Sequence, residues 1–276
     1  MMPDHAKAAR ELLVFYGEAG VDMALDEAAH DYLTPVEPEA KTLPPSPAFP
    51  DKGGSRSETA AGSSRNAAAP LAPDAAVMAA REAARNAATL AELRAILDRF
   101  EGCALKATAT QLVFADGNPK ARIMFVGEAP GYEEDKQGLP FVGRSGQLLD
   151  RMLAAIGLDR SKVYIANIVP WRPPGNRTPT PQEAAICLPF LLRQIALCDP
   201  DVLVCLGGPS AQTLLNLKEG ILKLRGRWFT FNTGTRDIRA MPTLHPAYLL
   251  RSPLAKRHAW RDFLAIKKAL ADSPRA

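Results

Sequence analysis

Short apolar runs alternate with amphipathic stretches along the C-terminal two thirds of the chain. Residues 123–126 read IMFV, a continuous apolar run typical of a strand that is buried on both faces. Residues 180–183 read TPQE, a typical helix start with proline at the first helical position. This alternation predicts an α/β fold in which helices cover both faces of a mostly parallel sheet. The expected strands are 111–114, 122–126, 163–168, 202–206, 228–231 and 240–243, and the expected helices are 145–156, 181–197, 209–216 and 256–271.

The first third of the chain has a different pattern. Residues 1–33 are rich in Ala, Leu and Glu from position 6 onward, which predicts an N-terminal helical segment. Pro, Ala, Ser and Gly dominate residues 34–73, which therefore cannot bury enough apolar surface to offset the entropy of ordering, and we expect a flexible linker. Residues 74–99 favour a helix again, with a capping-box signature at Thr89. An α/β domain is predicted over residues 74–276.

Charge is distributed unevenly over the 276 residues, which are 47% hydrophobic and carry a net charge of +4. Residues 1–95 hold nine Lys and Arg against fourteen Asp and Glu, a net charge of −5. Residues 96–276 hold twenty-five basic against sixteen acidic side chains, a net charge of +9. A basic globular part suits a polyanion such as nucleic acid, although ordinary solvation of a protein surface explains the same excess equally well.

Neither a membrane segment nor a secretory signal is recognisable. No apolar run approaches the roughly 18 residues that span a bilayer, and the N-terminus lacks a basic region followed by an apolar one. We therefore expect a cytoplasmic protein without membrane association. Cysteines in that compartment are reduced, so the four widely spaced cysteines, at positions 103, 187, 198 and 205, predict free thiols and not a disulfide framework.

The glycine-rich turn GEAPG at residues 127–131 is the most informative segment. It joins a predicted strand to a predicted helix, the place where α/β proteins bind ligands, although most such turns only change the chain direction. The turn carries Glu128, and Phe141 follows ten residues after it. Asn167 ends the next strand and His245 follows the last one. The carboxyl ends of parallel strands meet at one edge of a sheet, so we expect these side chains to converge there.

The converging side chains suit the recognition of a nucleobase. A carboxamide can read the donors and acceptors of a base edge, and an aromatic ring can stack on the base. A histidine can stabilise negative charge that develops on a departing group. Each residue type alone is more often structural, since an Asn at a strand end is usually a turn residue and a lone Phe usually fills a core. Their conjunction predicts a binding site for a base extruded from nucleic acid.

Three segments resemble the uracil-DNA glycosylase superfamily, and specifically its family 4. They read GEAPGYEEDKQGLPFVGRSGQLLDRML (127–153), VYIANIVPWRPPGNRTPTPQE (163–183) and HPAYLLR (245–251). The resemblance covers residues 100–270. It implies a three-layer α/β/α sandwich around a four-stranded, mostly parallel sheet. The N-terminal helical extension predicted from the residue pattern lies outside the resemblance. The resemblance also implies a monomeric, monofunctional hydrolase that flips uracil out of DNA and cleaves its N-glycosidic bond to leave an abasic site.

The resemblance assigns roles to residues of the three segments. Glu128 matches the carboxylate that positions or activates water, and His245 matches the histidine that stabilises the departing uracil anion. Water activation stays open between Glu128, Asn176 and backbone groups, because Ala129 replaces an aspartate of the best-known members. The implied catalytic residues are Glu128, His245 and Asn176.

Uracil and DNA contacts are implied in the same way. The uracil-binding residues are Ala129 and Gly131 through backbone amides, Glu134 through exclusion of thymine, Phe141 through stacking and Asn167 through the base edge. The DNA-binding residues are Tyr248, Leu249, Leu250, Arg251, Arg144 and Ser145, with an apolar side chain of the 248–251 segment expected to fill the space left by the flipped base.

The chain departs from the family at its cysteines. Family 4 proteins hold a [4Fe–4S] cluster with four cysteines, and two of the four positions here are Phe100 and Trp171. Only Cys103 and Cys187 remain, whereas a cluster requires four thiolates. The sequence therefore predicts no iron–sulfur cluster and no other metal site, with apolar packing of Phe100 and Trp171 instead.

Two alternatives stay open. The first is a non-catalytic or weakly catalytic binder of uracil or abasic sites in DNA, against which the intact Glu128, Asn167 and His245 favour an enzyme. The second is a wider activity on other deaminated bases, such as hypoxanthine or xanthine.

Overall fold

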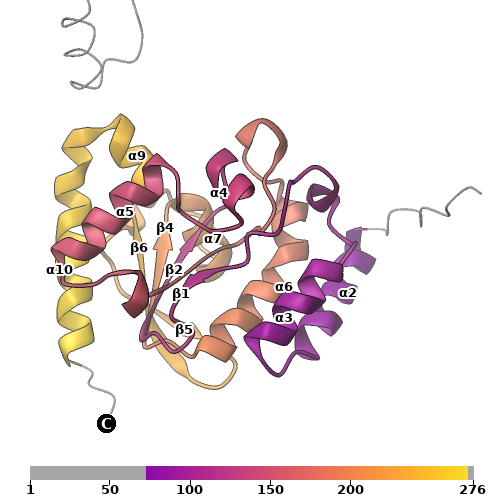
Figure 1. The fold of residues 1–276 in the computed structure, drawn as a ribbon. Coiled ribbons are helices and arrows are strands. Elements are labelled where there is room, and N and C mark those ends of the chain that lie inside the picture. The colour runs from indigo at the N-terminus through magenta and orange to yellow at the C-terminus, as the bar shows by residue number, and fades with distance from the viewer. Residues whose placement is uncertain (1–72, 273–276) are drawn as a thin grey trace, which may run out of the picture. The chain divides into compact units, whose positions relative to one another are not determined.

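The computed structural model describes residues 73–272, in which a central sheet lies between two layers of helices (Figure 1). The sheet has six strands in the order β1-β3-β2-β4-β6-β5. β3, β2, β4 and β6 are parallel, whereas β1 and β5 add antiparallel pairs at the two edges. The strands are β1 Asp116–Gly117, β2 Ile123–Gly127, β3 Tyr164–Asn167, β4 Val202–Leu206, β5 Phe229–Asn232 and β6 Asp237–Thr243.

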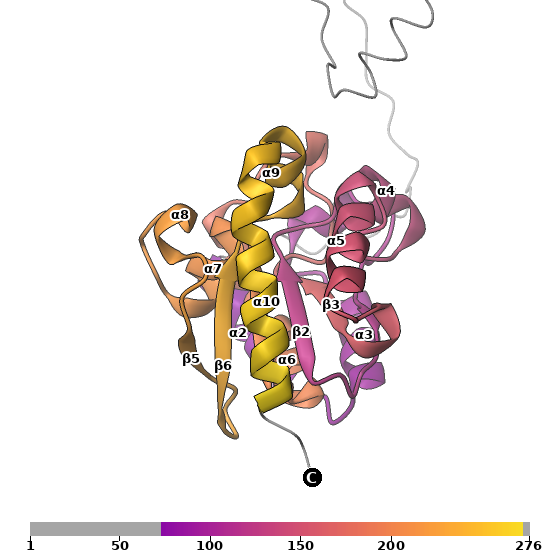
Figure 2. The same cartoon turned by 90° about the vertical axis from the view of Figure 1, so that its left-hand side faces the viewer.

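Side-chain alternation along the strands divides the core into two faces. In β2, Ile123 and Phe125 pack on one face, whereas Met124 and Val126 pack on the other. The first face is covered by α5 and α10, and Figure 2 shows α10 in front of the sheet. The second face is covered by α6, on which α2 and α3 pack. The predicted α/β/α sandwich is confirmed.

The helices of the described part follow the predicted pattern in the C-terminal two thirds. The α-helices are α2 Pro73–Arg85, α3 Leu90–Arg99, α4 Tyr132–Gln137, α5 Arg144–Ala155, α6 Pro181–Cys198, α7 Gly208–Leu215, α8 Ile221–Leu224, α9 Pro246–Arg251 and α10 Lys256–Asp272. Short 3₁₀ turns are η1 Ala104–Ala107, η2 Arg160–Lys162, η3 Pro174–Asn176 and η4 Pro253–Ala255. None of the helices between residues 73 and 272 is long and apolar enough to cross a membrane.

Two expectations about the sheet are wrong. The sheet has six strands and not four, because the hairpin of β5 and β6 and the two-residue pairing of β1 extend the four parallel strands. Residues 111–114 form no strand, although Leu112, Val113 and Phe114 are buried. Their apolar run fills the core from a loop, in which the Val113 amide donates to the carbonyl of Pro170.

The single helix expected over residues 74–99 is broken in two. The Thr89 hydroxyl accepts a hydrogen bond from the Glu92 amide at 3.1 Å and starts α3, so the capping signature marks a second helix start. Arg193 of α6 donates to the carbonyl of Ala87 in the break and ties it to the domain. The helical segment predicted at 1–33 and residues 34–72 of the linker predicted at 34–73 lie outside the described residues, and Pro73 is the first residue of α2.

Candidate active site

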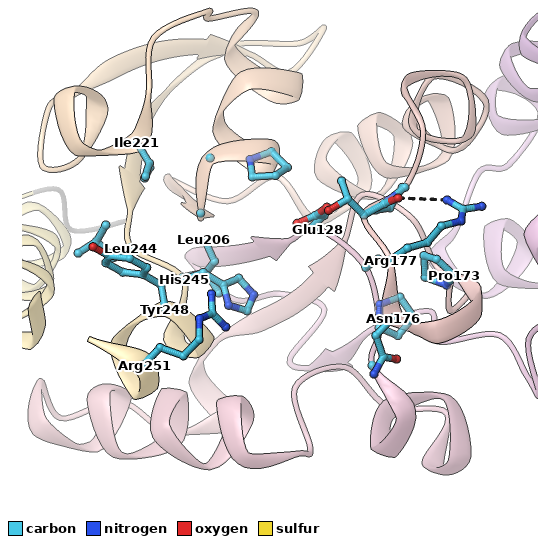
Figure 3. A pocket seen from close by; sticks show the side chains of 18 residues that line it. Glu128, Pro173, Asn176, Arg177, Leu206, Ile221, Leu244, His245, Tyr248 and Arg251 are labelled. Carbon is cyan, nitrogen blue, oxygen red and sulfur yellow. Dashed lines mark hydrogen bonds between the residues drawn. The ribbon is translucent and has the colours of Figure 1, made fainter. Parts of the chain in front are cut away.

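The carboxyl ends of the parallel strands surround a cavity of about 340 Å³ (Figure 3). Each of β2, β3, β4 and β6 is followed by a segment that contributes to its wall, as expected for the ligand-binding edge of a parallel sheet. In Figure 3, Glu128 and Arg177 lie on the opposite side of the cavity from His245, Tyr248 and Arg251. The wall consists of Glu128, Ala129, Pro130, Gly131, Pro173, Asn176, Arg177, Thr178, Pro179, Leu206, Gly207, Gly208, Pro209, Ile221, Leu244, His245, Tyr248 and Arg251.

Gly127 brings the predicted base-reading residues together beside this cavity. It pairs with Asn167 across β2 and β3, and a Cβ at Gly127 would lie 2.4 Å from Asn167 Oδ1 and 2.7 Å from the Phe141 ring. Any larger side chain at this position would therefore displace both residues. Asn167 and Phe141 are not among the residues that line the cavity. Phe141 contacts one of those residues, His245, with ring centroids 5.5 Å apart.

The Asn167 carboxamide has an unused acceptor. Its Oδ1 is buried and has no hydrogen-bond partner among the described residues. Leaving a buried polar atom unpaired costs about 1–3 kcal/mol, so such an atom in a folded protein requires a reason. A ligand that carries an N–H donor would supply the missing bond.

His245 occupies the N-cap of α9, with its Nδ1 accepting a hydrogen bond from the Ala247 amide at 3.1 Å. A neutral imidazole carries one proton, which must then reside on Nε2. Burial, assisted by the positive charge of Arg251, lowers the pKa of His245 to about 4. The ring is therefore neutral at physiological pH and offers Nε2–H as a donor.

A buried ion pair fixes the strand end that precedes His245. Thr243, the last residue of β6, donates from Oγ1 to Asp262 of α10 at 2.7 Å. Arg225 donates to the same carboxylate from Nε at 3.0 Å. These bonds tie β6 to α10 two residues before His245 and restrict where its imidazole can lie.

Glu128 contributes a half-buried carboxylate to the cavity. Its Oε1 is buried without a hydrogen-bond partner in the described part of the chain. Burial raises the pKa of Glu128, whereas a hydrogen bond from the Thr178 side chain opposes this rise. A carboxylate with a raised pKa and a free lone pair is suited to hold water and to accept its proton.

Glu134 does not line the cavity but fixes the backbone around it. Its carboxylate accepts hydrogen bonds from the amides of Gly131, Val142 and Gly143 at 3.1, 3.0 and 2.9 Å. The side chain thus joins the glycine-rich turn after β2 to the turn that carries Phe141. Its carboxylate is committed to backbone donors.

Asn176 lies in the cavity wall but its amide oxygen is already engaged. Asn176 is exposed, with a left-handed φ of 56°, and its Oδ1 accepts a hydrogen bond from Arg172 Nε at 2.7 Å. Arg177 forms an ion pair with Glu183 at 2.6 Å, which anchors the same loop to the start of α6. Of the two side chains considered for water activation, Glu128 has an oxygen without a hydrogen-bond partner within residues 73–272, whereas the side-chain oxygen of Asn176 is bound by Arg172.

Two of the six predicted DNA-binding residues line the cavity, and one of the six is buried in the core. Tyr248 and Arg251 line the cavity, whereas Arg144 and Ser145 form the first turn of α5 outside it. Leu249 is only 1% exposed because it packs against Leu244 and Ala259 beneath α9. The burial of Leu249 in the core is at odds with the expectation that it contacts DNA, whereas its neighbour Leu250 is 37% exposed.

Apolar side chains occupy two of the four positions that the sequence resemblance assigns to cluster ligands. Trp171 is 2% exposed, and the Phe100 ring packs edge-on against Phe190 with centroids 5.0 Å apart. Cys103 and Cys187 remain as thiols with their Sγ atoms 3.8 Å apart. No group of three or more potential metal ligands occurs within the described residues. Two thiolates and two apolar side chains do not fit an iron–sulfur cluster, which requires four sulfur ligands.

Two residues near the site carried no recognisable signal in the sequence. Thr178 contacts Glu128 from a proline-rich loop, where a hydroxyl is ordinarily a turn or cap residue. Arg160 donates to the carbonyls of Pro140 and Phe141 from a segment nineteen to twenty residues away in sequence. Only the fold reveals either contact.

Comparison with known proteins identifies a family for this arrangement. Residues 114–264 match the model of the uracil DNA glycosylase superfamily. A protein named type-4 uracil-DNA glycosylase from Thermotoga maritima is 48% identical over 151 residues, which cover 54% of this chain and 77% of that protein. Proteins of the same name from Archaeoglobus fulgidus and Saccharolobus solfataricus are each 42% identical, over 168 and 181 residues. These matches cover 59% and 64% of this chain and 84% of each relative.

Proposed function

Because this chain belongs to the uracil DNA glycosylase superfamily, we propose that it excises uracil from DNA, hydrolysing the N-glycosidic bond of a flipped base and leaving an abasic site. The relatives named type-4 uracil-DNA glycosylase support this activity. The observation that carries the proposal is the buried, unpaired Oδ1 of Asn167, which meets the Phe141 ring at Gly127, while that ring in turn contacts His245.

Base selection follows from the hydrogen-bond pattern of uracil. Uracil presents an N3–H donor, which can occupy the free Oδ1 of Asn167, and an O4 acceptor, which can receive the carboxamide N–H. Cytosine presents an acceptor at N3 and would oppose Oδ1, so it would be rejected. The Phe141 ring would stack on the base, and the backbone amide of Ala129 would face its carbonyl oxygens, whereas the amide of Gly131 is already bound to Glu134.

Exclusion of thymine is assigned to the turn that Glu134 holds. The Glu134 carboxylate is committed to three backbone amides, so we infer that it acts through the position of the Phe141 turn and not through a free carboxylate. The turn would leave no room for the methyl group on C5 of thymine.

In the chemical step, the bond between C1′ of the sugar and N1 of uracil breaks and its electron pair leaves with the base. The negative charge spreads to O2 of uracil, where the neutral His245 donates its Nε2–H. A water molecule held by Glu128 attacks C1′ and transfers a proton to the carboxylate. The products are an abasic sugar and uracil, which takes up a proton from the solvent.

DNA binding is assigned to the rim of the cavity. Leu250 is the exposed apolar residue of α9 that can fill the space left by the flipped base. Arg251 and Arg144 would neutralise phosphates on either side of it. Arg251 also lowers the pKa of His245, so it would add to the positive potential felt by the departing anion. A monomeric state and a cytoplasmic location stay predictions.

We further propose that the protein contains no iron–sulfur cluster. The buried Trp171 and the packing of Phe100 on Phe190 support this proposal, because both side chains fill with apolar groups the positions at which a cluster would need sulfur ligands.

A labelled oligonucleotide with one uracil tests the proposed activity. Incubation followed by alkali should break the strand at the uracil, and matched oligonucleotides with thymine or cytosine should stay intact. A stable shifted complex without strand breaks would instead show the non-catalytic binder. Substrates with hypoxanthine or xanthine in the same sequence would reveal a wider activity.

A further inference from the structure

Phe141 is held in an unusual backbone conformation. Its φ is 55°, in the left-handed region that bulky side chains rarely adopt. Such strain persists only where the surrounding structure enforces it, and it is concentrated at functional sites. The ring of the same residue lies against Gly127 and His245 at the site. The contacts that enforce this conformation therefore also set the position of the ring.

Arg160, at the start of η2, binds one side of this turn. Its guanidinium donates to the carbonyl of Phe141 from Nη2 and to the carbonyl of Pro140 from Nη1, the latter at 3.2 Å. Two carboxylates orient the guanidinium: an oxygen of Asp116 lies 2.5 Å from Nη1 and an oxygen of Asp150 lies 2.8 Å from Nε. The Arg160 side chain is 26% exposed, so these bonds are partly protected from water.

Glu134 and α5 bind the other side of the turn. Glu134 Oε1 accepts the amides of Val142 and Gly143, directly after Phe141. Gly146 of α5 approaches so closely that a Cβ at its position would lie 1.6 Å from the Phe141 carbonyl oxygen. Arg160 thus binds the carbonyls of Pro140 and Phe141, and Glu134 binds the two amides that follow. Neither group needs to touch a base to determine where Phe141 lies.

We propose that Arg160 is a positioning residue for uracil recognition, which holds the strained turn so that the Phe141 ring is already placed to stack on the flipped base. This inference rests on the proposed function. Without Arg160 the turn can relax to a negative φ, which rotates the ring away from Gly127. The loss should appear in binding of the base, because the chemical groups Glu128 and His245 are held by other elements.

A double-mutant cycle with Phe141 tests the proposal. Arg160→Ala should raise KM for a uracil-containing oligonucleotide, and the inhibition constant of free uracil, about tenfold, the scale of losing one stacked base. The single-turnover rate at saturating substrate should change much less. Phe141→Ala should produce similar losses, and adding Arg160→Ala to it should cause no further loss, because Arg160 acts through the ring.

Arg236→Ala is the matched control. Arg236 also bonds two aspartates, Asp199 and Asp201, and two backbone carbonyls. These partners lie directly after the end of α6, and none of them lines the cavity. It should lower thermal stability without changing KM. If Arg160→Ala does not fold, Arg160→Lys replaces it, since lysine keeps the charge but lacks the fork that reaches both carbonyls.

Additive losses in the double variant, or a folded Arg160→Ala protein with wild-type KM and uracil inhibition, would overturn the positioning role of Arg160. Neither result would affect the proposed function. Wild-type protein that neither excises nor binds uracil would overturn the proposed function, and this inference with it.

Discussion

The imidazole of His245 lies beside the ring of Phe141, with centroids 5.5 Å apart and planes inclined by 31°. Burial, together with the charge of Arg251, lowers the pKa of His245 to about 4. A base that stacks on Phe141 would therefore lie next to a histidine that is neutral and donates from Nε2. The residue proposed to stack on the base and the residue proposed to stabilise the leaving group are therefore in direct contact.

His245→Gln should lower the single-turnover rate of excision by about 10²–10³, the effect of removing one donor to a developing anion. Glutamine keeps a polar group at the N-cap, so folding should be retained. Unchanged rates in a folded variant would contradict the role of His245.

The depressed pKa of His245 also predicts how stability depends on pH. Between its ordinary value of 6.5 and about 4, the unfolded chain binds a proton that the folded protein excludes. The contribution of this residue to stability is therefore present above pH 6.5 and is lost as the pH falls towards 4. Thermal melts of wild type and His245→Gln should show a smaller decrease for the variant over this range. Parallel curves would indicate an ordinary histidine.

Glu128 should determine the acid limb of the pH–rate profile. Its pKa is raised above 4.5 by burial, and it must be ionised to accept a proton from water. The value of kcat/KM should therefore increase with pH through a pKa above that of an exposed glutamate. Glu128→Gln should be slower and should lack this limb. A limb that persists in the variant would assign the titration to another group.

Asn167→Ala should separate function from stability. The substitution removes the carboxamide that reads the uracil edge, so excision should fall by orders of magnitude. It also removes a buried oxygen without a partner, so the melting temperature should be unchanged or slightly higher. A large loss of stability would mean that Asn167 serves mainly to hold β3.

Much of the site could be predicted because it lies where strands end. The buried runs fix β2, β3, β4 and β6, and their parallel order brings Glu128, Asn167 and His245 to one edge of the sheet. Local sequence did not determine which leucine of α9 faces solvent. Leu249 and Leu250 are equally apolar, and only packing against Ala259 buries the first.

Contacts between segments that are distant in the sequence could not be predicted either. Asn176 appeared available for catalysis, but Arg172 binds its oxygen. The apolar residues at 111–114 signalled burial correctly, yet no neighbouring strand pairs with them. Periodicity reports which residues are buried, whereas pairing and side-chain partners depend on the assembled fold.

Purified protein should be colourless and free of iron. The positions of two cluster ligands hold Phe100 and Trp171, which cannot bind iron, and Cys103 and Cys187 alone cannot hold a cluster. Elemental analysis and the visible absorption spectrum check this expectation. A brown preparation with about four irons per chain would contradict it.

Trp171 should replace the cluster as a source of stability. It is 2% exposed and belongs to the core between the sheet and α6, so Trp171→Ala should destabilise the protein by about 3–5 kcal/mol. Trp260 of α10 is 45% exposed and supplies the matched control, since its replacement by Ala removes much less buried surface. Denaturant unfolding of the two variants measures the difference. Equal losses would show that Trp171 is not a structural substitute for the cluster, because its burial would then contribute no more than a half-exposed ring.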